Sequence, residues 1–525
     1  MRANGAITTA DRAKARMIVA MRRLHHRTLH ESSARTYRRR VVDSSPAPRL
    51  VPAARRYKKM GWLPTSLLAA EKLPGETKLP PRYVVPYYAI GKIGWAIYGK
   101  SPIDPAIEYS PDGPFASAFP RTASDWGAPT DDAVFTALRL QGPNPFTLHR
   151  VDPDPAAGDA ADAVCFALDF SELFAGVVPP TIARFTVVDD ALTPTRIHVG
   201  PATHHPGDPG WDDAKRIVNQ LDARYSAFIR HLLNTHLMVG QAYALAAYTL
   251  PTWHPLREFM DFFTYGTAIV NHYAYDALLT ENSYFLRSNF VTPDDARLMM
   301  ENAARVFDFD EWLVPYDLEK RGLDAIPGHP YVEDARTVWP AIVQVVERHL
   351  DDLDIRDADV SDDPDLAWWY ITLARMLPDV DTIPPLGSRA DLVNLLTALI
   401  YNNVIHEVCG NLSPILDAAD PADKRGIDID DLKVMAAGGP APTPSAASVF
   451  LMEQASYVSS FNVTGNNLMT VNAARYIDDP KLRAAVEDLQ VTLRQLDAEL
   501  TARNAERTIP FLMMQPSKWE ASVSF

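Results

Sequence analysis

The sequence predicts a mainly α-helical protein with a small β component, built around two long central helices. Residues 211–250 are mostly helix formers with apolar residues on nearly every face, and residues 391–409 repeat this pattern. A helix that is apolar on all sides belongs in a protein core. Both segments also carry histidines, His231 and His236 in the first and His406 at the end of the second. Two buried helices with histidines predict one large helical domain formed around them.

The chain before the helical pattern has a different composition. Residues 1–60 contain 16 Lys and Arg against 3 Asp and Glu, and we predict that they form a basic, flexible N-terminal arm. Residues 61–125 are rich in Pro, Gly and Tyr, which favours an extended segment wrapped on the body of the protein. We expect residues 61–525, including this wrapping segment, to form the main domain.

Charge and cysteine content exclude some classes of protein. The 525 residues carry a net charge of −15 in spite of the basic arm, and so strongly acidic a body argues against nucleic acid as the main partner. The arm leaves a weak contact with a membrane surface open. Cys165 and Cys409 are too few for a disulfide framework, which fits a reducing compartment. Without a secretory signal pattern or a run of about 18 apolar residues, a cytoplasmic protein is expected, and its oligomeric state is not indicated.

His231 and His236 could bind one metal ion only in a widened helix. Five residues at about 100° each place two side chains ~140° apart on a regular α-helix. A π-type turn of about 4.4 residues reduces this offset to ~50°, and such turns are frequent at functional sites. The spacing therefore predicts a wide turn if the pair binds metal. Taken alone, the pair also fits two unrelated helix histidines, and His406 fits a buried core histidine.

The three histidines are part of a longer series of recognisable segments that follow one another along the chain. His406 follows His236 by 170 positions, and the chain ends at Phe525. The other matching segments are residues 141–145, 211–215, 252–256, 321–322, 330–335, 363–369, 503–504 and 509–511, with Phe135, Arg139 and Asn271. Together they resemble the lipoxygenases over residues 115–525. The likeness is to the bacterial type, which has the catalytic domain without the N-terminal β-sandwich lipid-binding domain of plant and animal members.

This resemblance implies a single non-haem iron, with manganese as the alternative, and no catalytic residue beyond the metal centre. The implied metal ligands are His231, His236, His406 and the terminal carboxylate of Phe525. The family often has a weak ligand, commonly Asn, four positions after the third histidine, where this chain has Gly410. Asn411, one position later, could replace it through a second π-type turn, or water could fill the place. Glu407 is expected to point away, toward an arginine or solvent.

The resemblance also implies the reaction. A lipoxygenase removes a hydrogen atom from the CH₂ between two cis double bonds of a polyunsaturated fatty acid, adds O₂ and yields a hydroperoxide. A long apolar substrate needs an apolar channel. By the same resemblance, Ala274, Leu278 and Phe285 would line it, although each also fits ordinary helix core.

Departures from the family keep other functions open. Ser226 and Ala227 stand where the family has a His-Gln or His-Glu pair, and Ser413 replaces a polar amide. Because residues around the ligands orient them and tune the metal, altered chemistry is an alternative: a hydroperoxide isomerase, or an oxidase of another apolar metabolite. A metal-free lipid-binding scaffold is a third reading. A hydrolytic zinc enzyme is least favoured, since the sequence lacks HExxH.

Overall fold

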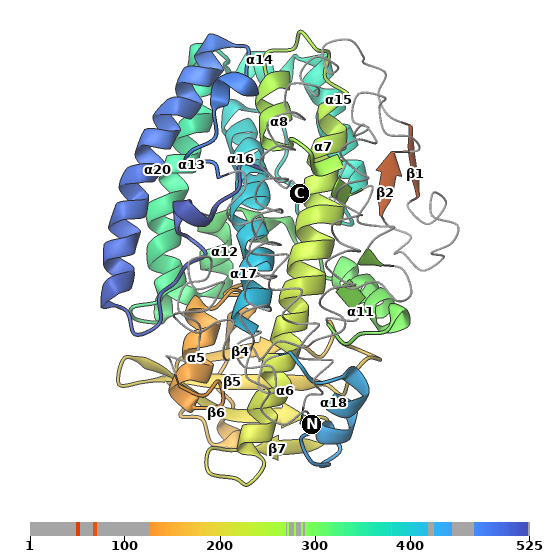
Figure 1. The fold of residues 1–525 in the computed structure, drawn as a ribbon, viewed down its shortest axis with the longest axis vertical. Coiled ribbons are helices and arrows are strands. Elements are labelled where there is room, and N and C mark those ends of the chain that lie inside the picture. Colours follow the sequence, from red (N-terminus) through yellow and green to blue (C-terminus); the bar gives the residue numbers. More distant parts are fainter. Residues whose placement is uncertain are drawn as a thin grey trace, which may run out of the picture.

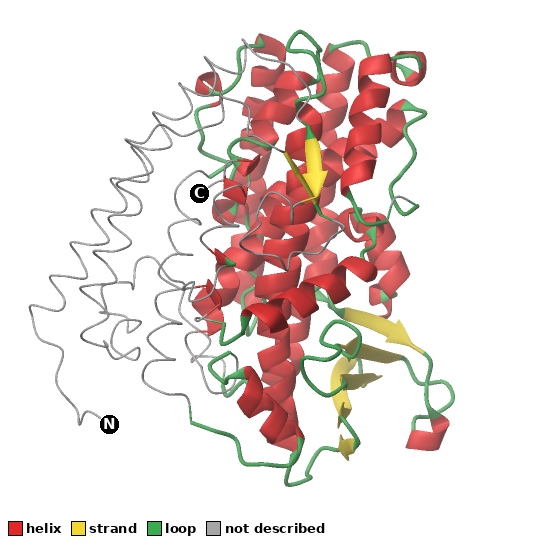
Figure 2. Cartoon of the chain, turned by 90° about the vertical axis from the view of Figure 1, so that its right-hand side faces the viewer, coloured by secondary structure: helices red, strands yellow, loops and turns green. Residues whose placement is uncertain are grey.

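The structure is a computed structural model, which describes residues 49–52, 67–70, 127–268, 270–271, 278–279, 285–286, 289–379, 381–417, 425–443 and 467–522. Most of the predicted basic arm and of the wrapping segment lies outside these residues, as do Ala274 and Phe525. Within the described residues, the helices run side by side along the long axis, and a small sheet lies at one end (Figures 1 and 2). The predicted mainly helical fold with a small β component is confirmed.

The strands form two antiparallel sheets. The small one pairs β1 (Leu50–Pro52) with β2 (Leu68–Ala70). The larger is a meander in chain order of β3 (Leu148–Val151), β4 (Cys165–Asp169), β5 (Thr181–Val188), β6 (Ala191–Val199) and β7 (Ala202–His204). Asp189 and Asp190 join β5 to β6 with φ of 49° and 62°, and aspartate tolerates the positive φ that a tight hairpin requires. Phe185 of β5 stacks on Phe135 of α5, and this contact ties the sheet to the helical body.

The helices that precede the second central helix are α5 (Asp132–Gln141), α6 (Trp211–Arg224), α7 (Gln241–Ala247), α8 (Arg257–Phe263), α11 (Pro293–Arg305), α12 (Val314–Arg321), α13 (Pro330–Asp352), α14 (Asp357–Ser361) and α15 (Pro364–Met376). After them come α16 (Arg389–Ile400), α17 (Glu407–Asp417), α18 (Ile429–Ala436) and α20 (Pro480–Glu506). Short 3₁₀ turns are η3 (Pro155–Ala157), η5 (Phe309–Trp312), η6 (Leu323–Ala325), η8 (Ala473–Arg475) and η9 (Pro516–Lys518). Two π-helical segments, η4 (Tyr225–Gly240) and η7 (Tyr401–His406), interrupt the two central helices.

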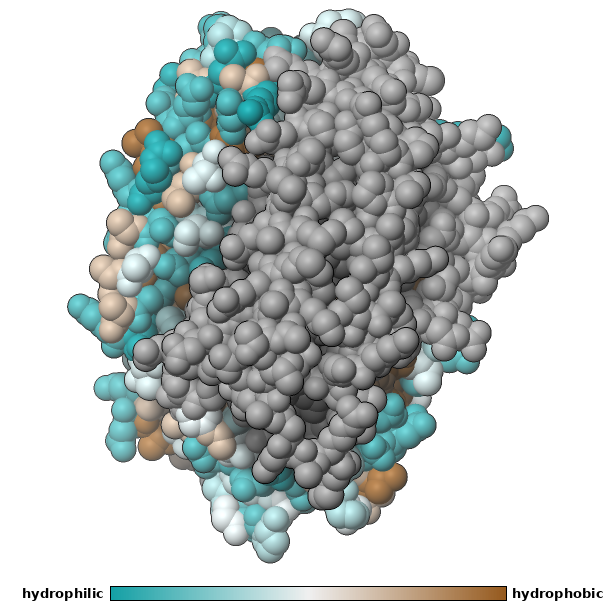
Figure 3. Space-filling view, viewed as in Figure 1, coloured by the Kyte–Doolittle hydropathy of each residue, from teal (hydrophilic) through white to brown (hydrophobic). Residues whose placement is uncertain are grey.

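The two central helices form the middle of the core. One is continuous from α6 through η4 to α7, and the other from α16 through η7 to α17 (Figure 1). The second is long and apolar enough to cross a membrane by length and composition alone, but 89% of its apolar window is buried in the protein. The long helices α13 and α20 pack against each other along one side of this pair. On the face seen in Figure 3, the described residues are mostly hydrophilic, with scattered apolar side chains.

Candidate metal centre

The π-helical segment η4 brings His231 and His236 together. All sixteen residues of Tyr225–Gly240 are wound in the wider turn, so the predicted wide turn is confirmed. Because five residues then make little more than one turn, the two imidazoles lie on one face. Their Nε2 atoms are 3.1 Å apart. His236 is buried, and the side chain of His231 is 18% exposed.

Glu407, the first residue of α17, completes this group. Its Oε2 atom lies 3.3 Å from Nε2 of His231 and 3.2 Å from Nε2 of His236. The carboxylate is 1% exposed, and the three potential ligand atoms all lie within 4.8 Å of one another. The expectation that Glu407 points away toward an arginine or solvent is therefore wrong.

His406 does not lie in this group, contrary to the expected convergence of three histidines. Its ring is sandwiched between Phe146 and Trp312, with ring centroids 4.5 and 5.5 Å away. Its Nδ1 atom is 3.5 Å from Nη1 of the buried Arg230. Adjacent side chains on a helix diverge by about 100°, so only one of residues 406 and 407 can face the histidine pair. The packing of α17 directs Glu407 toward the pair and His406 into the aromatic core.

Gly410 makes room for the imidazole of His231. A Cβ atom at this position would lie 1.9 Å from Cγ of His231 and 2.2 Å from its Nδ1. These distances are far below van der Waals contact, so any larger residue would displace the ring. In the sequence, Gly410 stands where the family has a weak ligand. In the structure, its lack of a side chain allows His231 to reach the group.

Asn271 orients His236 and selects its tautomer. The amide nitrogen of Asn271 donates to the backbone carbonyl of His236 at 2.5 Å and to Oε1 of Gln241 at 2.9 Å. Its oxygen is thereby directed at Nδ1 of His236, 2.9 Å away, and accepts the proton of that nitrogen. The lone pair of His236 is then on Nε2, the atom that faces His231 and Glu407, as a metal ligand requires.

Asn411 and Glu520 lie on the other side of Glu407. Asn411 is four residues after Glu407, on the same face of α17, and its Nδ2 donates to Oε1 of Glu407 at 3.2 Å. The same nitrogen lies 3.4 Å from Oε1 of Glu520 in the C-terminal tail. The structure thus places Asn411 beside the group, whereas the carboxylate of Phe525 lies outside the described residues.

The charges of the group stabilise one another. Burial lowers the pKa of His236, but the Glu407 carboxylate and Asn271 outweigh it, and the net pKa is raised above the usual value. Burial raises the pKa of Glu407, but both imidazoles outweigh it, and the net pKa is well below the usual range. Glu407 is therefore an anion at neutral pH, ready to ligate a cation.

The donor set fits a single transition metal. At metal–ligand distances of about 2.0–2.2 Å, ligand atoms lie about 3.0 Å apart at right angles and about 3.4 Å apart in a tetrahedron. The three separations here, from 3.1 to 3.3 Å, fall within this range. Two histidines and one carboxylate on one face are the donor set of non-haem Fe(II) oxygenases.

The predicted channel residues are only partly described. Leu278 and Phe285 are half-buried and pack on the hydrophobic core. The ring of Phe285 lies 4.9 Å from that of Phe228, which is three residues before His231. This places Phe285 against the helix that carries the histidine pair, while Ala274 lies outside the described residues. Their role in a channel stays a prediction.

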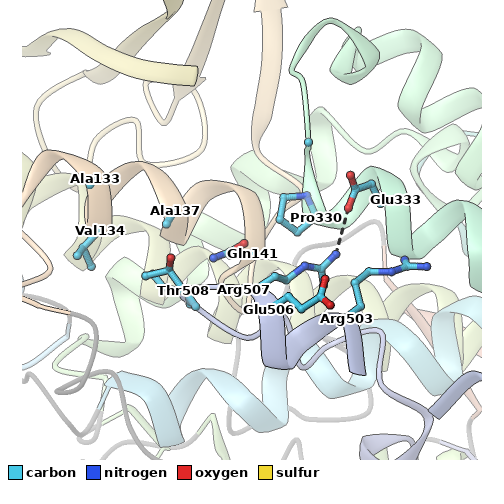
Figure 4. Close-up of a pocket in the computed structure, with 12 residues that line it drawn as sticks. Ala133, Val134, Ala137, Gln141, Pro330, Glu333, Arg503, Glu506, Arg507 and Thr508 are labelled. Atoms are coloured by element: carbon cyan, nitrogen blue, oxygen red, sulfur yellow. Dashed lines mark hydrogen bonds and ion pairs between the residues drawn. The ribbon is translucent and has the colours of Figure 1, made fainter. Parts of the chain in front are cut away.

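A cavity of about 510 Å³ lies elsewhere, between α5 and the facing ends of α13 and α20 (Figure 4). Its lining includes Glu333, Arg503 and Arg507 with the apolar Val134 and Ile509, and it contains no residue of the His231–His236–Glu407 group. Arg503 and Arg507 both form ion pairs with the buried Asp334. The two arginines at the cavity therefore serve to link the end of α20 to the start of α13.

Three residues of the site lie outside the set that the sequence predicts, and two of them have a signal in the sequence. Glu407 stands four positions before Asn411, the spacing expected between a third ligand and its amide, and this could have identified it. Asn271 was noted only as part of a family match. Glu520 gave no local signal, because its place depends on how the tail packs.

Comparisons with known proteins agree with this fold. The lipoxygenase family model matches residues 189–412, which include both histidines, Glu407 and Asn411. The linoleate 9/13-lipoxygenase of Pseudomonas aeruginosa is 27% identical over 474 residues, which cover 75% of this chain and 66% of that protein. The hydroperoxide isomerase ALOXE3 of Homo sapiens is 27% identical over 206 residues, covering 38% of this chain and 29% of that protein.

The solved structures agree on the fold. A lipoxygenase in complex with arachidonate superposes with a TM-score of 0.72 at 17% identity, over 95% of this chain and 82% of that one. At this identity the likeness shows the fold alone. Fold and site together define a helical protein whose described residues include a largely buried histidine–carboxylate group that could hold a metal ion. The family model, the curated relatives and the solved structures all support the lipoxygenase family, and the chain spans no more than 66% of the length of the two relatives named above.

Proposed function

We propose that this protein is a mononuclear non-haem metal dioxygenase that acts on a polyunsaturated fatty acid. The observation that carries the proposal is the buried group of His231, His236 and Glu407, formed by two π-interrupted core helices of a lipoxygenase fold. Iron is the metal we expect, with manganese as the alternative. A bound redox-active metal would supply one-electron oxidation of the substrate and a place for O₂ chemistry.

The protein's own residues hold and orient this site. His231 and His236 would offer their Nε2 atoms to a metal, and Glu407 would offer an anionic oxygen. Asn271 fixes the tautomer of His236, and Gly410 leaves space for the ring of His231. We propose Asn411 and the carboxylate of Phe525 as further ligands, with Asn411 supported by its place beside Glu407. His406 is not part of this proposed ligand set.

The substrate class follows from the relatives and from bond strength. The relative from Pseudomonas aeruginosa is a linoleate lipoxygenase by its name, and one structural neighbour holds arachidonate. Both fatty acids contain a CH₂ between two double bonds, whose C–H bond is weak because the resulting radical is delocalised over five carbons. We propose that this chain oxygenates such a CH₂ to a hydroperoxide, and that it does so in the cytoplasm.

The test uses protein without a C-terminal tag. We expect about one iron or manganese per chain by elemental analysis, as for a single three-ligand site. O₂ uptake should follow addition of linoleic acid but not of oleic acid, which has the same length and no CH₂ between double bonds. Absence of metal after reconstitution with Fe(II) and Mn(II) would refute the proposal and favour the metal-free scaffold.

A second candidate is a hydroperoxide isomerase, and Glu407 is the observation that favours it. A carboxylate in the place of a third histidine adds negative charge to the ligands, which favours the higher oxidation state of the metal and weakens it as an oxidant of C–H bonds. The similarity to the isomerase ALOXE3 agrees, over a smaller part of the chain. Anaerobic consumption of a preformed fatty acid hydroperoxide, with no O₂ uptake on linoleic acid, would favour this function.

A further inference from the structure

Glu520 is a buried carboxylate that the proposed function does not use. It is 1% exposed, and it lies in the C-terminal tail, far in sequence from the central helices. Its Oε2 atom has no hydrogen-bond partner. Burial, together with the nearby charge of Glu407, raises the pKa of Glu520 well above its usual range. An apolar residue would be cheaper to bury at this position.

The tail is docked firmly on both sides of Glu520. Trp519 is buried, its indole nitrogen donates to the carbonyl of Met513 at 2.9 Å, and its own carbonyl accepts from the amide of Leu468 at 3.0 Å. Ser522 donates to the carbonyl of Tyr265 at 2.6 Å. These contacts fix the backbone of residues 519–522, so the Glu520 side chain is held toward α17 by tertiary structure.

Asn411 connects the two carboxylates. Its Nδ2 has two hydrogens, and it lies within hydrogen-bond reach of Oε1 of Glu407, at 3.2 Å, and of Oε1 of Glu520, at 3.4 Å. One primary amide nitrogen can serve two acceptors in this way. The contact with Glu407 is made through Oε1, so Oε2 of that carboxylate stays directed at the histidine pair.

We propose that Glu520 is a positioning residue of the metal centre, which holds the Asn411 amide so that this amide fixes the Glu407 carboxylate toward His231 and His236. Docking of the C-terminal tail is thereby linked to the geometry of the ligand group through a relay of Glu520, Asn411 and Glu407. This inference rests on the proposed metal site. Loss of a group that orients a ligand typically lowers metal affinity about 10–100-fold.

The experiment is a Co²⁺ titration of the untagged, metal-free protein, followed by the visible ligand-field absorption of the bound ion. The variants are Glu520→Ala, Glu520→Gln, Asn411→Ala and the double variant Glu520→Ala/Asn411→Ala. Glu487→Ala, at an exposed position of α20, is the matched control. Thermal unfolding of each metal-free protein is recorded by circular dichroism.

We expect Glu520→Ala to weaken Co²⁺ binding about 10–100-fold. Glu520→Gln, which keeps an oxygen to accept from Asn411, should largely preserve it. In the Asn411→Ala background, Glu520→Ala should add little, because the relay is already broken. The metal-free Glu520→Ala protein should melt no lower than wild type, since an unsatisfied carboxylate has been removed, whereas a purely structural residue would lower the melting temperature.

Three results would overturn the inference. Wild-type affinity in Glu520→Ala would show that Glu520 does not act on the site. Additive losses in the double variant would show that it does not act through Asn411. A lower melting temperature in proportion to the lost affinity would show a structural role. If the wild-type protein binds no Co²⁺ at all, the proposed metal site itself fails, which is a distinct outcome.

Discussion

Gly410 shows how the site depends on a missing side chain. The imidazole of His231 occupies the space that a Cβ atom of residue 410 would need. A clash of this depth cannot be relieved by a few tenths of an ångström, because both groups lie on buried helices of a close-packed core.

We therefore predict that Gly410→Ala displaces His231 and lowers metal affinity by about 100-fold or more, with a loss of about 1–3 kcal/mol in the free energy of unfolding from overpacking. Gly387→Ala is the control, since its added Cβ would meet only the Asp391 carboxylate at 3.8 Å. Isothermal titration with metal and chemical denaturation measure the two effects. Normal metal affinity in Gly410→Ala would contradict the placement of His231.

The neighbouring residues 406 and 407 have different roles. His406 packs in the aromatic core, and Glu407 faces the histidine pair. His406 is a neutral ring between two aromatic rings, because burial and then the charges of Arg230 and Arg321 lower its pKa well below the usual value. Glu407 is the charged member of the pair and faces the histidines.

We predict that Glu407→Gln loses most of its bound metal and that His406→Phe keeps about one ion per chain, since only the former changes a ligand. The phenyl ring fits the aromatic sandwich, so His406→Phe should cost less than about 3 kcal/mol, chiefly for the lost contact with Arg230. Elemental analysis after gel filtration decides between the two residues. If Glu407→Gln kept its metal and His406→Phe lost it, the result would support His406 as the third ligand in place of Glu407.

At the scale of elements, the two π-helical segments are held in register by side-chain hydrogen bonds. Asn402 of η7 donates to the carbonyl of Thr235 in η4 at 3.1 Å and accepts from the indole nitrogen of Trp312 at 2.7 Å. Asn403 donates to the carbonyl of Phe263 at 2.7 Å. These bonds satisfy buried polar groups that an apolar core could not, and they fix where each ligand points.

We predict that Asn402→Leu destabilises the protein by about 2–5 kcal/mol, because the carbonyl of Thr235 and the indole of Trp312 both lose a partner in the core. Metal affinity should fall with it, since η4 and η7 are no longer held in register. Asn394→Leu, at a half-buried position of α16, should change stability far less. Equal effects in urea denaturation of the two variants would count against this role of Asn402.

At the scale of the whole molecule, a segment near the C-terminus lies beside the site. The segment from Trp519 to Ser522 is buried, and it brings Glu520 beside Asn411. The terminal carboxylate of Phe525, three residues further on, was predicted from the family resemblance as a ligand and lies outside the described residues.

We predict that a peptide tag added after Phe525 abolishes or strongly reduces metal binding, because it removes the terminal carboxylate that we propose as a ligand. The same tag at the N-terminus should leave about one metal ion per chain, the stoichiometry of a single site. Elemental analysis of the two tagged proteins checks this. Full metal content with the C-terminal tag would rule out the terminal carboxylate as a ligand.

The amino-acid sequence alone determined the fold class, the two central helices and the π-type turn at His231 and His236. These follow from local patterns, since apolar residues on every face require burial, and two histidines five positions apart require a wide turn if they bind one ion. No local pattern sets how the second central helix is rotated about its own axis. Whether residue 406 or 407 faces the histidine pair depends on which side chain the aromatic core around Phe146 and Trp312 accepts. Only tertiary packing decided this, and the same holds for Glu520, which reaches the site by the docking of the tail.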